Sequence, residues 1–244
     1  MPEPKAFHRH RGFTLVELAI VLVIVAFLTG GLLMGITAQR ASADSADAQR
    51  QLDNIREALI GFAMSKGRLP CPAQANLPNT DDMAGQELTP PCDGTLQHGV
   101  LPWKTLGLLE TDPWGRRFTY SVSSFDSSAS PSKSFARALP TGASASFSLT
   151  TIGSANVRET WNSTAAIASD LPVVIISHGI NGAGAFLPTG AQLPVSTDPN
   201  EAENSNATNL IFVSRTPGNN FDDLVTWIAP ATLMAKMVAA GRLP

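Results

Sequence analysis

The chain has 244 residues, of which 43% are hydrophobic and 15% charged, and its net charge at pH 7 is −3. Normal apolar content and a small net charge exclude disorder along the whole chain. There is no excess of positive charge of the kind that binds nucleic acid, so we expect no nucleic-acid partner. The two cysteines are too few for a disulfide-rich scaffold or a four-thiolate metal site.

A basic segment precedes the first apolar stretch. Residues 1–12 are net positive because Lys5, Arg9 and Arg11 outnumber the single acid, Glu3. Residues 18–36 carry no charge and are mostly apolar, and a helix of this length covers about 28 Å, close to the thickness of a bilayer core. The basic flank should remain in the cytoplasm and the rest of the chain should lie outside.

A cleaved secretory signal peptide is the alternative, since it has the same order of basic and apolar parts. The apolar stretch is followed by Thr37-Ala38-Gln39, which matches the small-residue cleavage pattern poorly. The stretch is also longer than an ordinary signal-peptide core. These features favour a retained helix.

Glu17 interrupts the apolar pattern, and a carboxylate at membrane depth is costly enough to indicate a function. Residues 11–17 read RGFTLVE and resemble the cleavage and methylation signal of type IV pilins and type II secretion pseudopilins. The resemblance implies that a prepilin peptidase cleaves after Gly12 and that Phe13 becomes the N-methylated terminus. It also implies that Glu17 takes part in assembly with other subunits.

One long helix is predicted over residues 13–66, with a transmembrane half at 13–37 and an amphipathic outer half. Gly67 and the following Leu69-Pro70 should end it. The outer half has an apolar stripe at helical spacing that requires a partner sheet, formed by Leu52, Ile55, Leu59 and Phe62.

Cys71 and Cys92 flank a proline-rich loop. If the head lies outside the inner membrane, the oxidising compartment favours a disulfide between them, with free thiols as the alternative. A redox or metal role would need a nearby motif such as C-x-x-C, which the sequence lacks.

Residues 67–244 should form the globular head, exposed to the periplasm or the cell exterior. We expect an α+β fold of the pilin type, in which a small antiparallel sheet packs on the long helix. The expected strands lie at 117–122, 146–151, 172–177 and 210–214. Residues 221–228 should be half strand and half turn, and a short helix is expected at 230–240.

A second resemblance concerns the head. The order of Asp112-Pro113-Trp114-Gly115, the segment 176–182 and the segment 221–227 is similar to the C-terminal half of major pseudopilins. This likeness implies a late loop that binds calcium through acidic and backbone oxygens. Asn181 stands where that pattern usually has aspartate, and loss of a carboxylate weakens a site for a hard cation. We therefore expect neither a bound metal nor a cofactor.

Candidate catalytic groups are few. Ser177 and His178 are neighbours in an expected strand, so their side chains should point to opposite faces and not form a nucleophile–base pair. Adjacent acids such as Asp222 and Asp223 are usually solvated turn residues. We expect no catalytic residue and no enzyme.

These observations predict a structural subunit, a minor pilin or pseudopilin with a single inner-membrane span and a periplasmic head, which enters a filament after processing. Its expected partners are the prepilin peptidase, other pilin or pseudopilin subunits and the inner membrane. A binding module displayed at a pilus tip is the alternative, followed by a membrane-anchored periplasmic enzyme. The residues leave open whether the machine is a type IV pilus, a type II secretion system or a competence pseudopilus.

Overall fold

The computed structural model describes residues 13–92, 97–124, 134–218 and 220–244, apart from the side chains of residues 29–38. The chain divides into two compact units, Met1–Ala43 and Asp44–Pro244. The expected cleavage residue, Gly12, lies outside the described residues.

Helix α1 spans Leu15–Lys66 and contributes residues to both units. In the first unit every large apolar side chain from Phe13 to Leu28 is exposed, with exposed fractions from 48% to 85%. In the part of the chain that is described, no helix has the length and apolar character needed to cross a membrane. The side chains of 29–37, within the span expected at 13–37, fall outside that part.

The outer part of α1 supplies one wall of the main core. Leu52, Ile55 and Leu59 are at most 2% exposed, and Phe62 is half-buried. The helix ends before Gly67, whose φ of +71° is a left-handed conformation that favours glycine. A Cβ at this position would lie 2.4 Å from the backbone oxygen of Ser144, so the close approach also requires glycine.

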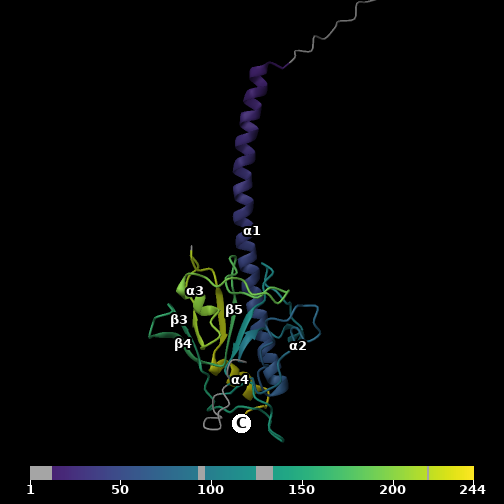
Figure 1. The fold of residues 1–244 in the computed structure, drawn as a ribbon, viewed down its shortest axis with the longest axis vertical. Helices are drawn as coiled ribbons and strands as arrows, with labels where there is room; N and C mark the ends of the chain where they lie inside the picture. The colour runs from purple at the N-terminus through teal and green to yellow at the C-terminus, as the bar shows by residue number, and fades with distance from the viewer. Residues whose placement is uncertain (1–12, 93–96, 125–133, 219) are drawn as a thin grey trace, which may run out of the picture. The chain divides into compact units, whose positions relative to one another are not determined.

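A four-stranded antiparallel sheet covers the apolar stripe on the outer part of α1. Its strand order is β1-β2-β5-β7, and β5 is labelled within the head in Figure 1. The strands are β1 (His98–Val100), β2 (Thr119–Val122), β5 (Val173–Ser177) and β7 (Leu224–Ile228). The α+β class, with an N-terminal helix and a small antiparallel sheet, is therefore confirmed.

Strand β5 is buried on both faces. Val173 and Ile175 join the core that contains the α1 stripe, whereas Val174 and Ile176 join a second core with Phe212. The continuous apolar run in this strand reflects that double burial, because a strand with one solvated face would alternate.

The second core lies under a sheet that we did not expect. Strands β3 (Ala155–Arg158), β4 (Ala166–Leu171) and β6 (Ile211–Val213) pair in the order β4-β3-β6. The β3–β4 pair is antiparallel and the β3–β6 pair is parallel. The expected antiparallel sheet is thus joined by a second sheet, and the strand expected at 210–214 lies in this second sheet, because β6 pairs with β3.

The strand expected at 146–151 is also absent. The backbone N–H of Thr151 donates to the carbonyl of Ser148 at 3.0 Å, and the N–H of Ser148 donates to Thr151 Oγ1 at 3.0 Å. Serine and threonine hydroxyls compete in this way with ladder hydrogen bonds and favour turns.

The described part of the head also contains three short helices: α2 (Trp103–Leu106), α3 (Pro199–Asn204) and α4 (Pro230–Ala239). Just after α4, Arg242 binds the C-terminal end of α1. Its Nε donates to the carbonyl of Met64 at 2.7 Å, and its Nη2 donates to the carbonyl of Ser65. These bonds satisfy carbonyls that the end of a helix leaves without intrahelical partners.

Candidate functional site

The start of α1 is held by a reciprocal set of hydrogen bonds between Thr14 and Glu17. The backbone N–H of Thr14 donates to Glu17 Oε2 at 3.0 Å, and Thr14 Oγ1 donates to the same oxygen at 2.8 Å. The N–H of Glu17 donates back to Thr14 Oγ1 at 3.2 Å. This geometry is a capping box. We did not predict it, although the T-x-x-E spacing before an apolar run is its sequence signal.

The capping box gives Glu17 a local role besides the expected one in assembly. Its carboxylate is already bonded at the first turn of its own helix, one residue from Phe13. Phe13, the expected methylation site, is 81% exposed. Thr14 is the one residue between Phe13 and the helix, and it holds the carboxylate of Glu17 at the helix N-terminus.

The predicted disulfide is present: Cys71 and Cys92 are bonded, with a Cα–Cα distance of 5.7 Å. Both residues are fully buried in the main core. A nearby ion pair fixes the loop, since Arg68 contacts both carboxylate oxygens of Glu87 at 2.7 and 2.8 Å. Glu87 also accepts the N–H of Cys71 at 3.2 Å. These contacts are structural.

Ser177 and His178 do not contact each other's functional groups, as expected from their alternation. Ser177 Oγ donates to Asp112 Oδ2 at 2.7 Å, while His178 Nε2 lies 2.8 Å from Thr119 Oγ1. The imidazole is fully buried, so the geometry offers no accessible nucleophile there.

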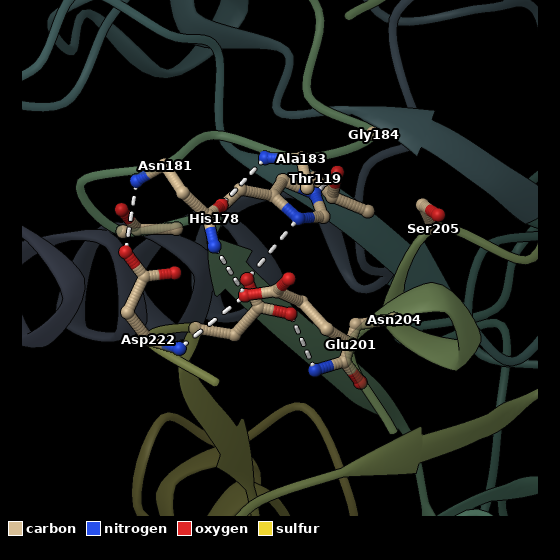
Figure 2. Close-up of polar contacts among 12 residues, drawn as sticks. Thr119, His178, Asn181, Ala183, Gly184, Glu201, Asn204, Ser205 and Asp222 are labelled. Atoms are coloured by element: carbon tan, nitrogen blue, oxygen red, sulfur yellow. Dashed lines mark hydrogen bonds and ion pairs between the residues drawn. The ribbon is translucent and has the colours of Figure 1, made fainter. Parts of the chain in front are cut away.

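Three acids gather beyond the end of β5, at a place where we expected only turn residues (Figure 2). Glu201 comes from α3, and Asp222 and Asp223 immediately precede β7. Their nearest ligand atoms all lie within 4.8 Å of one another. Glu201 and Asp223 are each only 2% exposed, so the interpretation of the aspartate pair as solvated is wrong for Asp223.

Hydrogen bonds hold one side of each acid. Asp223 Oδ2 accepts from Asn204 Nδ2 at 2.7 Å, and Asp222 Oδ2 accepts from the N–H of Asn181 at 2.8 Å. Glu201 Oε1 accepts from Asn181 Nδ2 at 2.8 Å. The network connects α3, β7 and the turn after β5.

The carboxylates of this cluster alter one another's pKa values. Burial raises the pKa of Asp222 to about 6, and the neighbouring Glu201 and Asp223 carboxylates add to the rise. Burial also pushes the pKa of Glu201 upward, but hydrogen bonds from Ser196 and Asn181 bring it below its ordinary value. A cluster of this kind favours the binding of a proton or a cation.

One comparison with known proteins gives a match. Residues 7–33 match the family described as the prokaryotic N-terminal methylation motif, which is the type IV pilin and pseudopilin signal. This match covers the expected cleavage, methylation and assembly positions. No curated protein and no solved structure matches the chain significantly. The motif implies a pilin-like structural protein that is anchored in a membrane or associated with a pilus.

Proposed function

We propose that the protein is a pilin or pseudopilin subunit that enters a filament through its N-terminal helix. In this proposal, prepilin peptidase cleaves after Gly12 and Phe13 is N-methylated. Residues 13–37 hold the subunit in the inner membrane, with the head in the periplasm, until it joins other subunits.

The observation that carries this proposal is the exposed apolar surface from Phe13 to Leu28, directly within the methylation motif. A helix that is apolar on all sides needs burial, in a bilayer or among other helices. A pilin provides both surroundings in turn, first lipid and then the helices of neighbouring subunits.

The packing of the head supports a structural role for the protein. Its buried disulfide and two packed sheets make a stable body beside the outer half of α1. The Ser177–His178 pair is divided between separate buried partners. We infer that the head presents a surface to neighbouring subunits and performs no chemistry.

The test is intact-mass analysis of the protein extracted from membranes and from sheared filaments. We expect a chain that begins at Phe13 and carries one methyl group. A chain that retains Met1, or that begins after Arg40, would contradict the proposal.

A single variant distinguishes a defect in processing from a defect in folding. Gly12→Ala should block cleavage, and the unprocessed chain should stay in the membrane fraction with its Cys71–Cys92 bond formed. Appearance of Gly12→Ala in filaments at the wild-type level would contradict the proposed route of assembly.

A further inference from the structure

We propose that His98 is an acid-sensitive latch between the two sheets of the head, and that its protonation releases β6 from the main sheet. His98 is the first residue of β1, in the main sheet. Its ring stacks on Phe212 of β6, in the second sheet, with the ring centroids 6.1 Å apart and the planes inclined by 7°. The imidazole therefore forms part of the contact between the sheets.

The position of His98 follows from the pairing of the main sheet. His98 lies opposite Ser121 of β2, which in turn lies opposite Val174 of β5. Residues directly opposite each other in neighbouring strands have their side chains on the same face of a sheet. Val174 belongs to the second core, so the side chains of this row face the second sheet. The imidazole is the titratable group of the row.

The surroundings of His98 favour a neutral ring. Its Nδ1 is hydrogen-bonded to Oγ of Ser121, which is only 1% exposed. One face of the imidazole lies against Phe212, which is fully buried. Burial lowers the pKa of His98 to about 4, and the charge of His178 adds to the fall. The packed sheets therefore disfavour the protonated imidazole.

The elements packed around His98 bring no acid that would stabilise a positive charge there. Strand β6 (Ile211–Val213) has no titratable residue, and Tyr120 of β2 lies in the main core, on the opposite face of the sheet. His178, which follows β5, is the charged group that acts on His98 among the described residues, and it lowers the pKa. A proton on His98 is therefore more stable in water than between the sheets.

The edge of the second sheet at β6 is the part that can open. Strand β6 has three residues and pairs with β3 on one side. On its other side, the side-chain amide of Asn204 donates to the carbonyl of Val213 at 3.0 Å and accepts its N–H at 2.7 Å. Strand β4, at the opposite edge, is joined to β5 through Pro172 alone and stays with the main sheet. Short edge elements open at a lower free energy than central strands, so release should begin at β6.

The direction of the pH effect follows from the two pKa values of His98. Opening exposes the ring to water and returns its pKa to about 6.5. The open state then binds more protons than the packed state between pH 6.5 and pH 4, so acid favours opening. The open population should rise about thirtyfold from pH 7.5 to pH 5. This opening takes place within one head and does not depend on processing or filament assembly.

The experiment is hydrogen exchange of the full-length protein in detergent, measured by mass spectrometry at pH 7.5 and pH 5 and normalised to the intrinsic exchange rate at each pH. In wild type, protection of β6 should fall about thirtyfold between the two pH values. Urea below the unfolding transition should leave exchange of β6 at pH 5 unchanged, because a local opening exposes little surface. Strand β2 should remain better protected, and its exchange should increase with urea.

Two variants remove the titrating ring in different ways. His98→Phe keeps a ring against Phe212, and His98→Asn keeps a hydrogen-bonding side chain beside Ser121. In both, protection of β6 should change less than about threefold between the two pH values. Asp170→Asn is the control, because it removes an exposed titratable group from β4 and should keep the thirtyfold loss of wild type. Three results would overturn the proposal: no loss in wild type, equal loss in β2 and β6, or the full loss retained in both His98 variants.

Discussion

Thr14 and Glu17 cap the same helix end that prepilin processing would expose. The threonine hydroxyl both donates to the carboxylate and accepts from the glutamate N–H. Glu17 therefore has two properties that a mutation can remove separately: its hydrogen bonds to Thr14 and its negative charge.

The first prediction separates these two properties. Glu17→Ala and Glu17→Leu remove both, whereas Glu17→Gln removes the charge and can keep the capping box. All three variants should be cleaved at Gly12, because the peptidase reads the glycine and the basic leader. All three should reduce incorporation into sheared filaments about tenfold or more, since in the proposed filament a charge pair in low dielectric would set the register between helices. Wild-type amounts of the processed Gln variant in filaments would show that only the cap matters.

The second prediction concerns the disulfide. Its cysteines are separated by 21 positions, and closing a loop of that size contributes about 3 kcal/mol in the chain-entropy model. The Cys71→Ala/Cys92→Ala variant should unfold about 6–12 °C below wild type, as measured by circular dichroism. Dithiothreitol should lower the wild-type Tm to a similar value and leave the double variant unchanged. A Tm for the double variant equal to that of oxidised wild type would contradict the structural role.

The third prediction concerns the end of α1. Arg242→Gln removes the guanidinium that binds the carbonyls of Met64 and Ser65, and should cost about 1–2 kcal/mol. Hydrogen exchange should rise in the last turn of α1 and much less in the main sheet. Lys236→Gln, at an exposed position on α4, is the control and should leave exchange at the end of α1 unchanged. Equal protection in the two variants would mean that Arg242 does not hold the helix end.

The fourth prediction concerns His98, a half-buried histidine in β1. Burial lowers the pKa of His98 to about 4, with a smaller contribution from the charge of His178. The unfolded state then binds more protons than the folded state between pH 6.5 and pH 4, so stability falls as pH falls through this range. From pH 7.5 to pH 5 the loss should be about 2 kcal/mol.

The variant His98→Asn tests this source of pH dependence. It removes the titrating ring, whose Nδ1 bonds Ser121 Oγ and whose face stacks on Phe212. The variant should be less stable at pH 7.5 but should lose less stability than wild type on going to pH 5. Urea unfolding at both pH values measures the difference, and the same loss in both proteins would exclude His98 as its origin.

Elements with a strong local pattern were predictable from the sequence. The stripe of Leu52, Ile55 and Leu59 indicated a helix with one buried face, and the apolar run at 172–177 indicated a buried strand. The second sheet was not predictable, because β3 and β4 are short and β4 is largely exposed. Neither strand therefore carries a hydrophobic pattern strong enough to detect.

The two candidate sites also differ in how far they could be predicted from the sequence. The T-x-x-E spacing at Thr14 and Glu17 is local, so the capping box could have been found by inspection. Glu201 lies 20 positions from Asn181 and 21 from Asp222, in helix α3, whose polar composition gives no indication of burial. Only the path of the chain between β5 and β7 brings the third carboxylate to the aspartate pair.

Strands β4 and β5 belong to different sheets, yet only Pro172 separates them in the chain. A mechanical load applied to the β3–β4 hairpin would therefore reach the middle of the main sheet after a single residue. There β5 is hydrogen-bonded to β2 on one side and to β7 on the other, so the load would be shared by both ladders. In a filament under tension, the connection at Pro172 would therefore make the two sheets unfold together.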